Sequence, residues 1–214
     1  MKPNPLVLKT LVMVGVPVLA AAILFPVFAR SRENARRSGC QSNLKQIGLG
    51  FAQYMRDYDD HLPPVKFTTF VAAKNQRSAS TGAYGWVDGR QPYLKSICIF
   101  YCPSGLAPPQ MGPKERAYTN YWMNARLDGA KRSGTVAQII LTGDGVGTDA
   151  RSTARYALGE PPTQTPTCGG YNDLCQSAYR HLGGANFGFL DGHVKWLLPE
   201  QVSARKGDAA TFAP

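Results

Sequence analysis

The sequence lacks the patterns that most catalytic proteins carry. Its 214 residues contain no G-x-S-x-G elbow and no catalytic cysteine signature, so nucleophilic catalysis is not indicated. No C-x-x-C pair occurs among the five cysteines, which argues against a thioredoxin-type or zinc-ribbon site. Histidine is scarce, with three residues in all. We therefore expect a protein that is not an enzyme and holds no resident cofactor.

Acidic residues are also few. The chain has 14 Asp and Glu against 24 Lys and Arg, a formal net charge of +10. No zinc-finger spacing or RNA-binding aromatic motif accompanies this charge, so nucleic acid is not an expected partner. Basic residues instead gather directly after the apolar N-terminus, where each can gain about 1 kcal/mol near anionic lipid headgroups. They are Arg30, Arg32, Arg36, Arg37 and Lys45.

Charge is absent altogether from Thr10 to Ala29, between Lys9 and Arg30. At a rise of about 1.5 Å per residue, a helix of this length spans a hydrocarbon core of about 30 Å. A soluble core helix is rarely apolar on every face. We predict a transmembrane helix over 10–29, kinked at its two prolines. Its anchoring side chains include Leu11, Leu19, Leu24, Phe25, Pro26 and Phe28.

A cleaved signal peptide is the competing interpretation of this region. Lys2 and Lys9 resemble a basic n-region, and Ala20–Ala22 offers small residues for cleavage. The apolar run continues beyond these alanines to Phe28, which favours a retained anchor. The basic residues after the span would by themselves place the C-terminal domain in the cytoplasm.

An amphipathic pattern follows the apolar run. Apolar residues recur at spacings of three and four from Leu44 to Tyr58, and Pro63-Pro64 ends the pattern. We therefore divide the chain into an N-terminal tail (1–9), a transmembrane helix (10–29), a helical extension (30–62) and a β-rich domain (63–214). Candidate strands in that domain are Val65–Ala72, Ser96–Tyr101 and Thr135–Thr142.

The strongest local signal is a β-hairpin over Asn186–Leu197. Two alternating runs flank Asp191-Gly192, a dipeptide that favours a type I′ turn, and we expect Leu190 and His193 to close it. The motif residues His181, Asp191, Gly192 and His193 are expected to be structural. An alternative is a metal site formed by His181, Asp191 and His193, because histidine and carboxylate suit zinc and other transition metals.

Two further sites are expected from residues that border glycine-rich loops. Asp144 and Asp149 border a glycine-rich loop and offer oxygen ligands for calcium. Cys168 and Cys175 flank another glycine-rich loop, across which a disulfide is plausible in an oxidising compartment. The other cysteines are Cys40, Cys98 and Cys102, and the odd total leaves at least one thiol free or paired between chains.

Four segments together resemble a bacterial family of type II secretion G-like pseudopilins, the DUF1559 family. They are AILFPVFARSRENARRSGCQSNLKQIGLGFAQYMRDYDD (22–60), QPYLKSICIFYCPSG (91–105), AYTNYWMNARLDGA with VAQIILTGDG (117–130 and 136–145), and His181, nine residues, then Asp191-Gly192. The resemblance implies an α+β, pilin-like fold: a long N-terminal helix, half transmembrane and half amphipathic, packed on an antiparallel β-sheet. It also implies a cytoplasmic N-terminus in the bacterial inner membrane and an extracytoplasmic, periplasmic domain.

One departure from the family pattern bears on function. Family members carry a prepilin-peptidase site of the Gly-Phe-Thr-x-x-Glu type, whereas the corresponding region here reads NPLVLKTLVMVGVPVLAA. The carboxylate that is thought to pair with a neighbouring subunit's terminal amine is missing. We therefore expect a non-catalytic accessory subunit whose helix docks on a larger membrane complex. The alternatives are a pseudopilin or pilin of a filament, and a metal-dependent enzyme or sensor.

Overall fold

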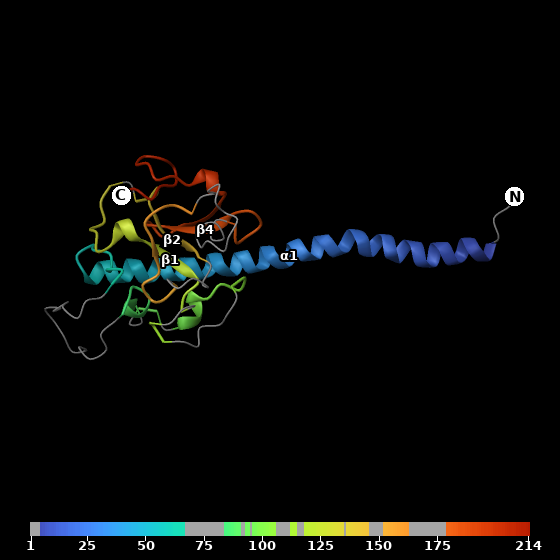
Figure 1. The fold of residues 1–214 in the computed structure, drawn as a ribbon, viewed down its shortest axis with the longest axis horizontal. Coiled ribbons are helices and arrows are strands. Elements are labelled where there is room, and N and C mark those ends of the chain that lie inside the picture. Colours follow the sequence, from blue (N-terminus) through green and yellow to red (C-terminus); the bar gives the residue numbers. More distant parts are fainter. Residues whose placement is uncertain are drawn as a thin grey trace. The chain divides into compact units, whose positions relative to one another are not determined.

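Helix α1 (Pro5–Asp57) contains the whole charge-free run and both of its prolines (Figure 1). An 18-residue window of this helix has a mean hydropathy of 2.0, and none of that window is buried. Large apolar side chains are exposed around it, with Met13 and Phe25 each 79% exposed. The helix is therefore long and apolar enough to cross a membrane.

The computed structural model describes residues 5–66, 84–90, 93–94, 96–105, 112–114, 118–134, 136–145, 152–162 and 179–214. The chain divides into two compact units, Met1–Ala35 and Arg36–Pro214. The division falls within α1, so residues 36–57 of the helix belong to the second unit. That unit holds all the strands found among the described residues.

The second unit contains a five-stranded sheet in the order β3-β1-β2-β4-β5. The strands are β1 (Tyr121–Asn124), β2 (Ile140–Asp144), β3 (Ala157–Leu158), β4 (Ala185–Phe189) and β5 (Val194–Leu197). Strand β3 runs parallel to β1, and the other pairs are antiparallel. The fold is thus α+β with a long N-terminal helix on a sheet, as predicted, but the sheet is mixed because β3 reaches β1 by a crossover.

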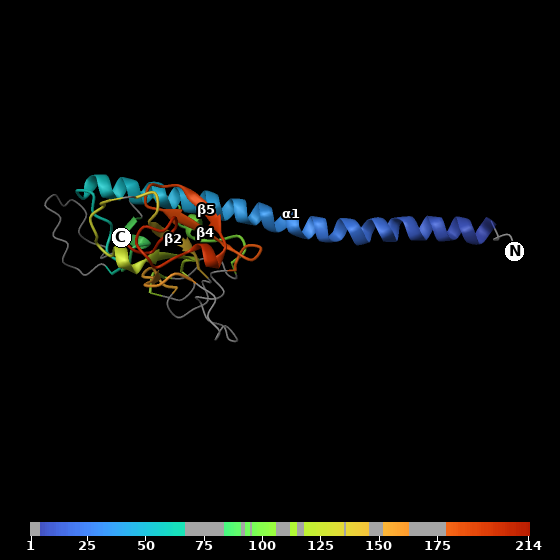
Figure 2. The ribbon, with the colours of Figure 1, turned by 90° about the horizontal axis from the view of Figure 1, so that it is seen from above.

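Apolar side chains alternate between the two faces of the sheet. Residues 36–57 of α1 cover one face, where Leu44, Ile47 and Phe51 join Met123 in one buried cluster (Figure 2). The other face carries Trp122, with Phe187 and the C-terminal segment around Phe212, in a second cluster. The predicted amphipathic stripe is therefore the face by which α1 packs on the sheet.

Two of the predicted strands differ from the structure. Ser96–Tyr101 is not a strand, because Ile97–Phe100 forms a 3₁₀ helix whose first turn is capped by the Ser96 hydroxyl. The predicted strand Thr135–Thr142 begins later, at Ile140, and runs to Asp144. Of Val65–Ala72, residues 67–72 lie outside the described residues.

The predicted C-terminal hairpin is present as β4 and β5, but its turn is of another type. Phe189 and His193 close it, and the Gly192 N–H donates to the Phe189 carbonyl at 2.9 Å. Gly192 alone has a left-handed backbone, with φ of 92°. The loop is therefore a three-residue type I turn completed by a left-handed glycine, and the type I′ prediction is wrong.

The features of a type I′ turn occur immediately before β4. Leu182 and Gly183 have φ of 54° and 81°, and His181 and Gly184 exchange hydrogen bonds of 2.8 and 3.2 Å. Both central residues thus adopt the left-handed conformation that this turn requires. The turn fixes the backbone of His181 at the start of the hairpin.

Candidate functional site

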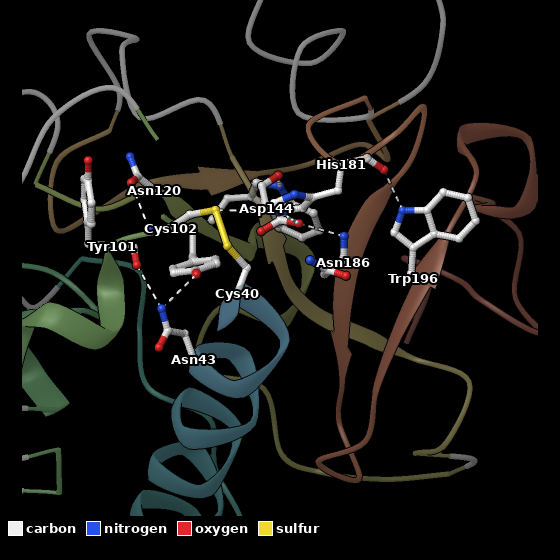
Figure 3. A network of polar contacts seen from close by, with 11 residues as sticks. Cys40, Asn43, Tyr101, Cys102, Asn120, Asp144, His181, Asn186 and Trp196 are labelled. Atoms are coloured by element: carbon white, nitrogen blue, oxygen red, sulfur yellow. Dashed lines mark hydrogen bonds and ion pairs between the residues drawn. A yellow bond between two sulfur atoms is a disulfide. The ribbon is translucent and has the colours of Figure 1, made fainter. Parts of the chain in front are cut away.

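A buried polar cluster lies between residues 36–57 of α1 and the sheet (Figure 3). It consists of Cys40 on α1, Cys102 after the 3₁₀ helix, Asp144 at the end of β2 and His181 before β4. All four residues are fully buried. Four segments that are far apart in the sequence therefore deliver polar side chains to one point under the helix.

A disulfide joins Cys40 to Cys102, with 5.3 Å between their Cα atoms. The Asn120 side chain accepts a hydrogen bond of 3.0 Å from the Cys102 N–H. Sequence reasoning missed this pair and favoured Cys168 with Cys175, which lie outside the described residues. One signal was available, because Cys40 precedes Leu44 by four residues and so extends the apolar stripe. Cys98 is an exposed free thiol.

His181 and Asp144 meet beside this disulfide. The His181 Nε2 atom lies 3.3 Å from Asp144 Oδ2 and 3.6 Å from Cys102 Sγ. The Asn186 N–H donates to the same Asp144 oxygen at 2.7 Å, and Trp196 Nε1 donates to the His181 carbonyl at 2.8 Å. Strands β4 and β5 thus hold both members of the pair.

Some polar atoms in the cluster and beside it have no hydrogen-bond partner among the described residues. These are Asp144 Oδ1 and both the amide oxygen and nitrogen of Asn186, all fully buried. A buried polar group without a partner costs about 1–3 kcal/mol, and more when it is charged. The cluster and its surroundings therefore contain buried hydrogen-bonding atoms that no described residue satisfies.

Tyr121 borders the cluster on the side of the helix. The Asn43 side chain donates to the Tyr121 hydroxyl at 3.3 Å and to the Tyr101 carbonyl at 2.8 Å. Burial raises the pKa of Tyr121 well above its usual range, and the nearby Asp144 carboxylate adds to the effect. The hydroxyl therefore stays protonated in the folded protein, and Asn43 ties α1 to β1.

The residues predicted to form a metal site do not come together. His181 belongs to the buried cluster, whereas Asp191 and His193 pair with each other at 2.6 Å on the partly exposed hairpin turn. Among the described residues, the group with metal-ligating atoms in mutual reach is Cys40, Cys102, Asp144 and His181, within 4.8 Å of one another. The trio His181, Asp191 and His193 is therefore not brought together, and Asp191 and His193 pair with each other on the turn. Asp149 of the calcium prediction lies outside the described residues.

A family model described as "Protein of unknown function (DUF1559)" matches residues 29–96. The predicted DUF1559 family is confirmed over this segment. No curated protein and no solved structure matches the chain. The DUF1559 segment contains Cys40 and Asn43, the two residues that α1 contributes to the cluster and its border. The other cluster residues lie beyond the matched segment.

The cluster is closed to solvent in its disulfide form. The disulfide occupies both sulfur atoms, and full burial keeps the imidazole and the carboxylate away from solvent. The DUF1559 match together with the apolar helix fits a membrane-anchored, pilin-like protein.

Proposed function

We propose that this protein is a non-catalytic accessory subunit, anchored by α1 and docked through it on a larger membrane protein complex. The observation that carries the proposal is the apolar part of α1, whose side chains are exposed over a complete 18-residue window. Exposed apolar surface of this extent calls for lipid or protein around it. The second unit contributes a stable body, joined to its own part of the helix by the Cys40–Cys102 disulfide.

A structural role is supported by the burial of the candidate site. Catalysis needs reacting groups that a substrate can touch. The carboxylate of Asp144, the imidazole of His181 and both sulfur atoms are fully buried. Their contacts run from Cys40 on α1 through Cys102 and His181 to Asp144 on β2, and such contacts stabilise the packing of the helix on the sheet.

The choice between an accessory subunit and a filament subunit rests on the charge of the helix. In pilins a carboxylate in the apolar half of the helix is thought to pair with a neighbour's terminal amine, as the family resemblance implies. In α1 the first acidic residue is Glu33, beyond the apolar run. A filament subunit of a type II secretion or pilus-like machine is therefore the second candidate.

The expected location is the bacterial inner membrane, with the second unit in the periplasm. The Cys40–Cys102 disulfide supports this side of the membrane, because disulfides persist in oxidising compartments. The exposed Arg30, Arg32 and Arg36 after the apolar run count against this orientation under the positive-inside rule, and we give the disulfide more weight than these charges.

Site-specific photo-crosslinking in intact cells tests the proposal. A photoreactive residue is placed at Leu19 or Phe25 in the apolar run, or at Leu49, which is 64% exposed in the second unit, as the matched control. An accessory subunit should give one adduct of fixed mass with another membrane protein, from positions on one side of the helix. A ladder of self-crosslinks would overturn the proposal in favour of a filament. Crosslinks to lipid alone would overturn docking and leave a simple tether.

The mature N-terminus provides a second readout of the same proposal. Mass spectrometry of membrane-extracted protein should show an uncleaved apolar helix. Cleavage near residue 10 with N-methylation would favour the filament, and cleavage after Ala20–Ala22 with release from the membrane would show a signal peptide.

A further inference from the structure

We propose that Cys40, Cys102, Asp144 and His181 form a tetrahedral site for a zinc-like divalent cation when their disulfide is reduced. The cluster then has two mutually exclusive states, a disulfide and a metal centre. The disulfide ties α1 to the segment after the 3₁₀ helix, and the metal centre would add the end of β2 and the residue His181 before β4 at the same point. The proposal concerns the second unit and does not depend on the membrane role.

The distances already match those between the ligands of a tetrahedral zinc ion. With bonds of about 2.3 Å to sulfur and about 2.05 Å to nitrogen, a tetrahedral centre separates these two atoms by about 3.6 Å. Cys102 Sγ and His181 Nε2 are 3.6 Å apart. A nitrogen and an oxygen on the same ion lie about 3.3 Å apart, and His181 Nε2 lies 3.3 Å from Asp144 Oδ2.

One separation has to change. Two sulfur ligands on zinc lie about 3.8 Å apart, so the Cys40 and Cys102 sulfur atoms must move apart once their bond is broken. The Cα atoms, at 5.3 Å, need not move far, because rotation about each Cα–Cβ bond displaces the sulfur. All ligand atoms lie within 4.8 Å of one another before any movement.

The ligand chemistry suits a borderline-soft cation. Two thiolates and an imidazole are the usual ligands of structural zinc, and a carboxylate oxygen can take the fourth position. The three negative charges of the thiolates and Asp144 are largely balanced by the charge of the cation.

Unfilled polar groups next to the site support the same conclusion. The Asn186 amide is fully buried and has no hydrogen-bond partner among the described residues, and the same is true of Asp144 Oδ1. Metal centres depend on such outer groups, which hydrogen-bond to the ligands and fix their orientation. The Asn186 N–H already donates to the Asp144 oxygen that would bind the ion.

The two states interconvert by a balanced exchange. Once local opening of the second unit exposes the buried Cys40–Cys102 bond, a dithiol reductant gives it two electrons and two protons. The bond becomes two thiols while the reductant becomes a disulfide. Binding of one divalent cation then releases the two thiol protons to solvent. Reoxidation by a disulfide-bearing oxidant re-forms the sulfur–sulfur bond and expels the cation.

Cobalt and zinc titrations of the full chain in detergent test the site. Cys98, Cys168 and Cys175 are replaced by serine, so that Cys40 and Cys102 are the remaining thiols of the five. The protein is reduced with a phosphine and titrated with Co²⁺. We expect one cobalt per chain, with the strong visible bands of a tetrahedral ion, a thiolate charge-transfer band, and displacement by Zn²⁺.

The same protein before reduction is the matched control and should bind no cobalt. His181→Ala and Asp144→Asn, checked for folding in the oxidised state, should weaken cobalt binding by at least about tenfold, since even outer-sphere changes can cost that much. Zinc should also raise the melting temperature of the reduced protein. If both variants bind cobalt as tightly as the protein that keeps His181 and Asp144, the binding is adventitious thiolate binding and the proposal is overturned. It is equally overturned if the reduced chain binds no cation.

Discussion

The Cys40–Cys102 disulfide should supply a large share of the stability of the second unit. It closes a loop with a sequence separation of 62 residues. In the chain-entropy model, closing a loop of this size lowers the entropy of the unfolded chain and so raises its free energy by about 4 kcal/mol. Domains of ordinary size are stable by about 5–15 kcal/mol in total, so the double variant Cys40→Ala/Cys102→Ala should lose a substantial part of this stability.

Urea unfolding of the full chain in detergent, with a metal chelator present, measures this loss. Trp86 and Trp122 are fully buried, so their fluorescence reports the unfolding of the second unit. Reduction of the wild type should lower the free energy of unfolding by a similar amount and should not affect the double variant. Cys98→Ala is the matched control and should change stability by less than about 0.5 kcal/mol, because Cys98 is exposed. A loss below about 1 kcal/mol in the double variant would refute the argument.

Four other substitutions test the site, the hairpin turn and the turn before β4. His181→Ala should lower the free energy of unfolding by about 3 kcal/mol, because it leaves buried Asp144 without its imidazole partner. His193→Ala on the partly exposed hairpin turn should lower it by less than about 1 kcal/mol. Chemical denaturation of both variants measures the two losses. The Tyr121 hydroxyl keeps its proton in the folded state, because its pKa is raised there, whereas in the unfolded chain it ionises near pH 10. The contribution of Tyr121 to the free energy of unfolding is therefore complete below about pH 10 and falls by about 1.4 kcal/mol per pH unit above it. Tyr121→Phe should remove that slope in melts recorded between neutral and alkaline pH. Leu182→Asn should raise stability by about 0.5 kcal/mol, because asparagine tolerates the left-handed backbone at φ of 54° better than leucine does; an unchanged or lower melting temperature would contradict this.

Periodicity predicted the elements whose structure depends on local sequence. The charge-free run and the stripe from Leu44 onward identified α1, because helix formation and burial both follow the 3.6-residue repeat. The alternation around Asp191-Gly192 located the hairpin. Its turn type was mistaken because Asp-Gly also fits a three-residue loop that needs a single left-handed residue, Gly192.

Long-range contacts determine the structural features that the periodicity of the sequence did not predict. The segment Ser96–Tyr101 is apolar enough for a strand, but its backbone groups are satisfied locally in a 3₁₀ turn while Ile99 and Phe100 are buried. The buried cluster joins residues from α1, from the end of β2 and from the turn before β4. No spacing in the sequence encodes the meeting of Asp144 with His181, which depends on β2 pairing with β4.

The position of the disulfide along α1 has a mechanical consequence. The second unit begins at Arg36, and Cys40 lies within the next turns of the helix. Tension that reaches this unit along the chain from residue 35 therefore meets a covalent bond before it meets Leu44, Ile47 and Phe51, whose contacts are non-covalent. Pulling would load the Cys40–Cys102 bond before this apolar face, and the face could not be peeled from the sheet one turn at a time.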